Sequence, residues 1–186
     1  MVSVFINDRL NDFDLDEALA TLPEQRREQA LKFKHEMGRR TCVAAYQLLC
    51  QALLSLYGIK EKPLFEYGPH GKPTIMGQPD IHFNLSHCRE AAICIVSDHP
   101  VGVDIETPGH YKEAVARYAM NDVELHSILQ AEQPDIAFTR LWTMKEAVVK
   151  RAGTGIFNNM KEVLTDTSGL ITVQSPDLRY IYSIAP

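Results

Sequence analysis

The sequence predicts a globular protein of mixed helix and strand structure, built as one domain or as two small, tightly joined halves. With 186 residues and 45% hydrophobic content, the chain can bury a substantial core. A long helical pattern runs from Pro23 to Tyr57, and two further helical patterns lie nearer the C-terminus. Between them lie three segments with the apolar patterns of strands, either alternating with polar residues or forming a continuous buried run. They are residues 81–87, 91–96 and 101–106.

Charge and composition exclude several classes of function. A formal net charge of −5 argues against a dedicated nucleic-acid-binding protein, which usually carries a basic footprint. The four cysteines have neither C-x-x-C spacing nor matching histidine pairs, so no zinc site or redox dithiol is expected. No signal peptide and no apolar run of about eighteen residues is visible. We expect a cytoplasmic protein, most simply a monomer, that binds neither nucleic acid nor membranes.

The first part of the chain combines a strand with a long helix. Val2 to Ile6 is a β-branched and aromatic run that predicts a strand, and an acidic, irregular stretch follows it. The helical pattern from Pro23 ends at Gly58, and its second half carries core-type apolar spacing. Its first half has six basic against three acidic residues, a local net charge of +3. Such a run is more often a solvated face than a phosphate-binding patch, although both remain open. The basic residues are Arg26, Arg27, Lys32, Lys34, Arg39 and Arg40.

A rigid loop and a strand come next. Residues 67–73 consist of turn-forming residues that hold Lys72 either in solvent or against a phosphate group. In residues 81–87 the apolar side chains alternate with polar ones, which include Asn84 and Ser86. His87 falls at the end of this strand, where a single histidine is by itself weak evidence for function.

The stretch Val101-Gly-Val-Asp-Ile-Glu106 alternates strictly between apolar and other residues. Val103 would face a core, whereas Asp104 and Glu106 would share the opposite face. Two residues along a strand span roughly 6.6 Å. Two carboxylates at that distance can share one hard cation, and Mg²⁺ prefers one or two carboxylates together with substrate phosphate oxygens. The alternative is a half-buried strand with a solvated acidic face.

The segment Thr107-Pro-Gly109 breaks the pattern and predicts a boundary between residues 1–106 and 107–186. A helix is expected from Lys112 to Gln130, and a second from Pro134 to Arg151. In the second helix, four-residue spacing aligns three side chains on one stripe, namely Trp142, Glu146 and Lys150. A glutamate followed by a lysine at this spacing is a common surface pair, but the single tryptophan would draw the stripe against the protein. Residues 163–164, 170–173 and 179–184 look like strands.

Four segments, in order and spacing, resemble the Sfp-type 4′-phosphopantetheinyl transferases, and the chain length suits the shorter members, which act on acyl carrier proteins. They are Gly71-Lys-Pro73, Phe83-Asn-Leu-Ser-His87, Val101-Gly-Val-Asp-Ile-Glu106 and Trp142-Thr-Met-Lys-Glu-Ala-Val-Val-Lys150. The resemblance implies an α+β fold of two pseudo-symmetric halves, each a small antiparallel sheet packed on a long helix. Coenzyme A would bind in the cleft between the halves.

The resemblance also implies a reaction. The phosphopantetheine arm of coenzyme A would pass to a serine hydroxyl of an apo acyl or peptidyl carrier protein, with release of adenosine 3′,5′-bisphosphate. Asp104, Glu106 and Glu146 would hold Mg²⁺. Glu146 matches the proposed base, and Lys150 would neutralise or protonate the leaving group.

Further positions match by the same resemblance. Lys72, Ser86 and His87 match contacts to coenzyme A and its phosphates. Arg40 matches the region that holds the 3′-phosphate, with Arg39 and Arg26 as alternatives. Glu124 matches a further acidic position.

Two other functions remain as alternatives. A Mg²⁺-dependent hydrolase of nucleotide pyrophosphates would use the same carboxylates and would consume coenzyme A without an acceptor. A non-catalytic binder of coenzyme A or of a carrier protein would be favoured if one of the three carboxylates were missing, and all three are present. Which carrier protein is served, and whether acyl-coenzyme A is accepted, stays open.

Overall fold

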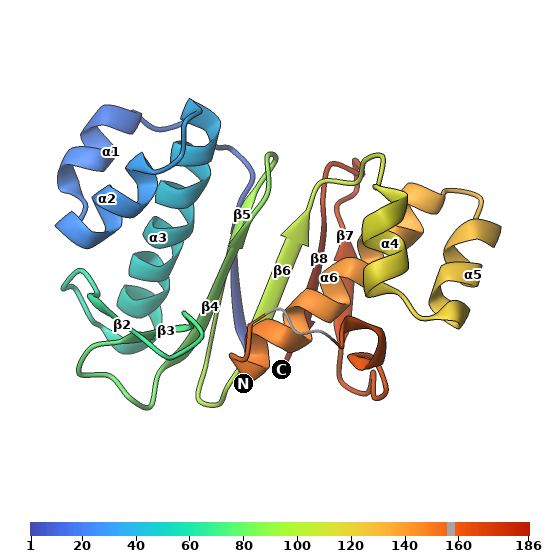
Figure 1. The fold of residues 1–186 in the computed structure, drawn as a ribbon. Helices are drawn as coiled ribbons and strands as arrows, with labels where there is room; N and C mark the ends of the chain where they lie inside the picture. The colour runs from blue at the N-terminus through green and yellow to red at the C-terminus, as the bar shows by residue number, and fades with distance from the viewer. Residues whose placement is uncertain (156–158) are drawn as a thin grey trace.

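Two small antiparallel sheets, each packed against a long helix, form the two halves of the molecule (Figure 1). The structure is a computed structural model that describes residues 1–155 and 159–186. Within those residues it contains six α-helices, one 3₁₀ helix and eight strands. The arrangement confirms the predicted α+β class and the packing of each sheet on a long helix.

The sheet of the N-terminal half has the strand order β1-β5-β4. Its strands are β1 (Ser3–Asn7), β4 (His82–His87) and β5 (Ala92–Ser97). Helix α3 (Glu36–Tyr57) covers one face, because its apolar stripe packs against alternate residues of β5. The smaller elements around it are α1 (Leu15–Thr21), α2 (Glu24–Leu31) and the hairpin of β2 (Phe65–Tyr67) and β3 (Pro73–Ile75).

The predicted continuous helix from Pro23 to Tyr57 is wrong, because α2 and α3 are separate helices. The side chain of Phe33 lies in the break and packs on the core. Gly38 lies in the first turn of α3, and a Cβ atom there would lie 2.8 Å from the Phe33 ring, so this close packing needs glycine at residue 38. The break lets α2 fold back along α3.

The sheet of the C-terminal half has the strand order β6-β8-β7. Its strands are β6 (Gly102–Glu106), β7 (Ile171–Gln174) and β8 (Ile181–Ala185). Helix α6 (Pro134–Ala152) lies across β6 and β8. The remaining elements are α4 (Glu113–Ala119), α5 (Asp122–Gln130) and the 3₁₀ helix η1 (Met160–Glu162). The strand-like residues 163–164 lie outside these strands.

The predicted helix from Lys112 to Gln130 is likewise divided, into α4 and α5. Asn121 caps α5, since its side chain accepts a hydrogen bond from the Glu124 backbone N–H at 2.9 Å. The Glu124 carboxylate accepts in return from the Asn121 backbone N–H at 2.8 Å. This reciprocal capping box fixes the start of a new helix.

Strand β6 pairs with β8 and not with β5. The predicted division between residues 106 and 107 remains a prediction, and the structure shows that β6 belongs to the same sheet as β7 and β8. Apolar residues explain this position. Ile93 and Ile95 of β5 pack against Val103 and Ile105 of β6 in a core that joins the two halves.

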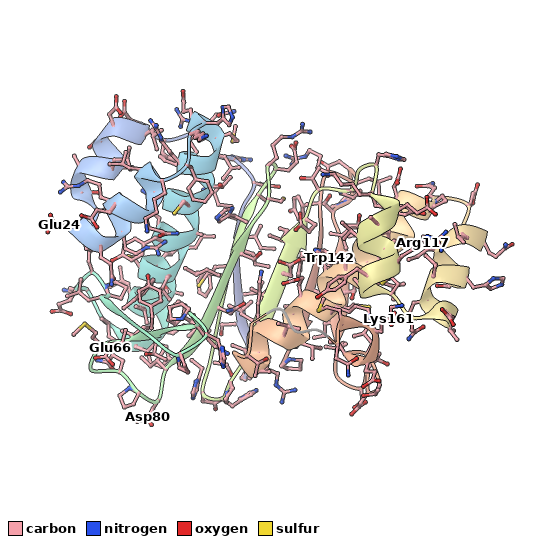
Figure 2. All side chains as sticks on the ribbon, in the orientation of Figure 1. Glu24, Glu66, Asp80, Arg117, Trp142 and Lys161 are labelled. Atoms are coloured by element: carbon pink, nitrogen blue, oxygen red, sulfur yellow. The ribbon has the colours of Figure 1, made fainter. Side chains whose placement is uncertain are left out.

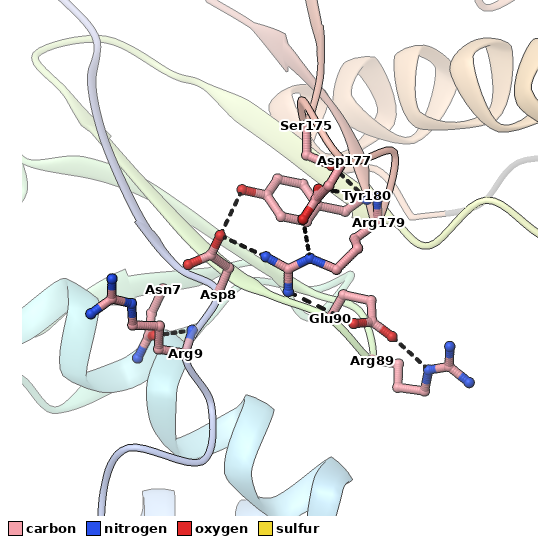
Figure 3. A network of polar contacts seen from close by, with 9 residues as sticks. All are labelled: Asn7, Asp8, Arg9, Arg89, Glu90, Ser175, Asp177, Arg179 and Tyr180. Atoms are coloured by element: carbon pink, nitrogen blue, oxygen red, sulfur yellow. Dashed lines mark hydrogen bonds and ion pairs between the residues drawn. The ribbon is translucent and has the colours of Figure 1, made fainter.

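A polar network also joins the halves (Figure 3). Arg179, between β7 and β8, contacts Asp8 after β1 at 3.1 Å and Glu90 in the β4–β5 turn at 3.9 Å. The Tyr180 hydroxyl donates to Asp8 at 3.4 Å. Among the helices that the structure describes, none has both the length and the apolar character needed to cross a membrane.

Candidate active site

One pocket at the junction of the halves gathers most of the predicted site residues, and we call it the acidic pocket. Strand β4, strand β6 and helix α6 supply its side chains, and it encloses about 380 Å³. The lining residues are Leu85, Ser86, His87, Asp104, Glu106, Trp142, Glu146 and Lys150. Trp142 points inward from α6, whereas Glu24 and Asp80 lie at the periphery of the N-terminal half (Figure 2). The predicted stripe on α6 therefore faces the predicted acidic face of β6.

Asp104 stands at the centre of the pocket and is 3% exposed. Its Oδ1 atom lies 2.5 Å from the Lys150 ammonium and accepts a hydrogen bond from the Ser86 hydroxyl at 2.9 Å. Lys150 also donates to Ser86 Oγ at 3.0 Å. The three side chains thus form a closed triangle that links β4, β6 and α6.

The outer edge of β6 is held by side chains of β4. The backbone N–H of Val103 donates to Asn84 Oδ1 at 2.9 Å, and that of Ile105 donates to Ser86 Oγ at 3.4 Å. Sequence reasoning did not single out Asn84. The signal available was its position two residues before Ser86 on the polar face of the same strand.

Burial and mutual repulsion perturb the carboxylates. Burial and, after it, the charge of Asp104 raise the pKa of Glu106 to about 7, even though Lys150 acts in the opposite direction. The pKa of Glu146 is also raised by burial and by Asp104. Three carboxyl groups that share one pocket with a single lysine are short of positive charge at neutral pH.

The fit of the pocket to a metal ion can be judged from its donor atoms. Asp104 Oδ2 and Glu146 Oε1 are buried and find no hydrogen-bond partner among the described residues. A buried carboxylate oxygen without a partner is costly, and a hard cation would satisfy both. Within residues 1–155 and 159–186 no group of three or more acidic, histidine or cysteine side chains is arranged so that it could hold a metal ion. The unpartnered oxygens of Asp104 and Glu146 are nevertheless donors of the kind that Mg²⁺ takes, together with water and phosphate oxygens.

His87 lines the same pocket from the end of β4. Burial and the nearby charge of Lys150 lower its pKa, so the imidazole is neutral at physiological pH. Its ring packs edge-on against Phe33 with centroids 5.6 Å apart. His87 is therefore held between the acidic pocket and the segment that joins α2 to α3.

Lys72 does not line the acidic pocket. Its ammonium donates to the carbonyl of Arg151 at 2.7 Å and to that of Val101 at 3.3 Å. Burial lowers its pKa, and the charge of Arg151 lowers it further. In this structure Lys72 binds the C-terminal end of α6, where a cation is favoured.

The three candidate arginines also lie outside the pocket. The Arg40 guanidinium binds Glu36 at 2.8 Å and the carbonyl of Phe13 at 2.9 Å. Arg39 donates to the carbonyl of Phe33 at 2.9 Å. Because the Phe33 ring also packs on His87, Phe33 contacts both residues. Arg26 is buried over the rings of Tyr46 and Phe65.

Glu124 is separate from the acidic pocket as well. Its carboxylate pairs with the fully buried Lys145 at 2.9 Å, and Lys145 also donates to the carbonyl of Met160 at 2.7 Å. Lys145 precedes Glu146 and points to another side of α6. This ion pair ties α5 and η1 to α6.

The chain is similar in sequence to known proteins of one family. Residues 100–183 match the 4′-phosphopantetheinyl transferase superfamily. A 4′-phosphopantetheinyl transferase of Bacillus subtilis is 30% identical over 181 residues, which cover 94% of this chain and 80% of that protein. The 4′-phosphopantetheinyl transferase psf-1 of Bacillus pumilus is 31% identical over 158 residues, with coverage of 82% and 68%. HetI of Nostoc sp., a further 4′-phosphopantetheinyl transferase, is 31% identical over 151 residues, with coverage of 76% and 64%.

The fold and the pocket define an α+β enzyme that carries its acidic site between two halves. This chain belongs to the 4′-phosphopantetheinyl transferase family and is a transferase.

Proposed function

We propose that the protein transfers the 4′-phosphopantetheine group of coenzyme A to a serine hydroxyl of an apo acyl or peptidyl carrier protein and releases adenosine 3′,5′-bisphosphate. Family membership supports this reaction. The observation that carries it is the acidic pocket, where Asp104, Glu106 and Glu146 meet Lys150 at the junction of the halves.

The chemistry requires these residue types. A serine oxygen attacks the β-phosphate of a pyrophosphate, so negative charge must be neutralised on both sides of the breaking P–O bond. Asp104, Glu106 and Glu146 would hold a Mg²⁺ ion, which supplies that neutralising charge. The two unpartnered oxygens of Asp104 and Glu146 support this assignment.

Glu146 is our candidate for the general base. Its pKa is raised by burial and by Asp104, which brings the carboxylate nearer to the operating pH. It would accept the proton of the serine hydroxyl as the new P–O bond forms. Lys150, on the same face of α6 one turn later, would donate a hydrogen bond to the departing phosphate of adenosine 3′,5′-bisphosphate.

The remaining candidates would bind coenzyme A. Ser86 and His87 already line the acidic pocket, and Lys72 would exchange its bonds to the α6 carbonyls for a phosphate contact. Of the three arginines, Arg40 remains our first candidate for the 3′-phosphate. Its present bonds to Glu36 and to the Phe13 carbonyl would have to open in part.

The test is mass spectrometry of purified apo carrier proteins after incubation with the protein, Mg²⁺ and coenzyme A. We expect a mass gain of one phosphopantetheine group and an equal amount of adenosine 3′,5′-bisphosphate. A carrier protein whose acceptor serine is replaced by alanine should gain nothing. Consumption of coenzyme A without an acceptor would favour the pyrophosphate hydrolase, and binding without turnover would favour a non-catalytic role.

A further inference from the structure

Strand β6 carries Asp104 and Glu106. Among the strands that the structure describes, only β8 pairs with it, so the other edge of β6 has no strand hydrogen-bonded to it. The pairing with β8 runs from Gly102 to Glu106. In a strand, the N–H groups of residues i and i+2 point to the same edge. The N–H groups of Val103 and Ile105 therefore point together to the other edge, which faces β4. Both residues are fully buried, so each N–H needs an acceptor.

Two side chains of β4 supply those acceptors. Asn84 and Ser86 are two residues apart, as are Val103 and Ile105, and both pairs therefore span roughly 6.6 Å. Asn84 accepts from Val103 at 2.9 Å and Ser86 accepts from Ile105 at 3.4 Å. Side chains here replace the carbonyl groups that a neighbouring strand would supply.

The hydrogen-bonding capacity of Ser86 is already used in full. A hydroxyl group has one donor and two acceptor positions. Ser86 donates to Asp104 at 2.9 Å and accepts from Lys150 at 3.0 Å and from Ile105. It has no position left for the N–H of Val103. Asn84 therefore carries that bond, and it is 6% exposed, out of reach of bulk water.

We propose that Asn84 is a positioning residue for the transfer reaction. Its amide oxygen fixes the register of β6 against β4, so that Asp104 meets Ser86 and Lys150 in the acidic pocket. Asn84 is not among the residues that line this pocket, and it acts through β6 rather than on a substrate. The expected effect on the transfer rate rests on the proposed function. The expected effect on the position of β6 rests on geometry alone.

The experiment compares two substitutions at this position. Asn84→Leu keeps the number and branching of the side-chain heavy atoms and removes the acceptor, whereas Asn84→Asp keeps an acceptor oxygen. Thr172→Val is the matched control, since it removes a hydroxyl group on β7 that bonds Ser183 at 2.8 Å, in the sheet that contains β6. If Asn84→Leu does not fold, Asn84→Val takes its place, because it also lacks an acceptor and suits a strand.

Asn84→Leu should lower kcat by about tenfold to a hundredfold, the range that a shift of up to about 1 Å produces. The KM for coenzyme A should change by less than about threefold, since no substrate contact is lost. Asn84→Asp and Thr172→Val should retain most of the rate.

Two readouts do not depend on turnover. Hydrogen exchange should show that the Val103 amide loses protection in Asn84→Leu and keeps it in Asn84→Asp. Trp142, the single tryptophan, lines the acidic pocket together with Glu106, so its fluorescence can report binding of Mg²⁺ alone. Asn84→Leu should need more Mg²⁺ to reach the midpoint of that change.

A protected Val103 amide in Asn84→Leu would overturn the proposal. So would a raised KM at unchanged kcat, or equal impairment of Asn84→Leu and Asn84→Asp. If the wild-type protein modifies no carrier protein, the proposed function fails, and the exchange and fluorescence measurements still decide the role of Asn84.

Discussion

At Gly102 the backbone of β6 packs directly against the backbone of α6, and this contact makes a strong prediction for Gly102→Ala. A Cβ atom at this position would lie 2.0 Å from the carbonyl oxygen of Ala147 and 2.3 Å from the backbone nitrogen of Arg151. Both atoms belong to the helix backbone, so no side-chain rotation can relieve the contact. The strand that carries Asp104 would have to move away from the helix that carries Glu146.

The size of the effect follows from these distances. Non-bonded heavy atoms rest at roughly 3.5 Å, so β6 and α6 must separate by on the order of 1 Å. Overpacking of this kind costs about 1–3 kcal/mol of stability. A misplacement of about 1 Å in a reacting constellation costs about a hundredfold in rate. Gly102→Ala should therefore fold with lowered stability and lose most of its activity.

The assay measures kcat, KM for coenzyme A and the free energy of unfolding in the same preparation. Gly109→Ala is the matched control, because a Cβ atom there meets nothing closer than 4.0 Å and the residue lies on the exposed connection after β6. We expect Gly109→Ala to resemble the wild type. If Gly102→Ala keeps a wild-type rate and stability, the close packing of β6 on α6 does not set the geometry of the pocket.

Three further predictions concern the acidic pocket and the basic residues. The pKa of Glu106 is raised to about 7 from an ordinary 4.5, so between these pH values the folded protein holds a proton that the unfolded chain has lost. Without metal, the free energy of unfolding should therefore fall as the pH rises from 4.5 to about 7. Allowing for the partial exposure of Glu106, the fall is roughly 1–2 kcal/mol; denaturant titrations should show a flatter profile for Glu106→Gln, and an identical profile would refute the assignment. Lys150→Ala should lower kcat more than it weakens coenzyme A binding, because leaving-group charge grows mainly in the transition state; weaker binding at an unchanged kcat would make Lys150 a ground-state contact. The wild type should prefer coenzyme A over 3′-dephospho-coenzyme A by about ten- to a hundredfold in kcat/KM, and Arg40→Ala should remove most of that preference. If the preference survives in Arg40→Ala, Arg39→Ala and Arg26→Ala alike, the 3′-phosphate binds elsewhere.

The residues of the acidic pocket could be predicted because their arrangement depends on local periodicity. Period-two alternation put Asp104 and Glu106 on one face of a strand, and four-residue spacing put Trp142, Glu146 and Lys150 on one face of a helix. The structure brings these two faces together.

Features that depend on distant contacts could not be predicted in this way. The pairing of β6 with β8 joins residues about eighty positions apart, and alternation says nothing about the choice of partner. The break before α3 depends on packing of Phe33 against Gly38. The start of α5 is different, because Asn121 and Glu124 form a capping pattern that is visible in the sequence and was missed.

We hold that the acidic pocket is the catalytic centre, and the substitution Asp104→Ala is the sharpest test of that claim. Removal of this carboxylate takes away a proposed metal ligand together with a source of repulsion for Glu106 and Glu146. The measurement is the rate of phosphopantetheine transfer to an apo carrier protein over a range of Mg²⁺ concentrations, with circular dichroism on the same sample. We predict a folded protein without measurable transfer even at saturating Mg²⁺. A folded variant with a near-normal rate would contradict the claim.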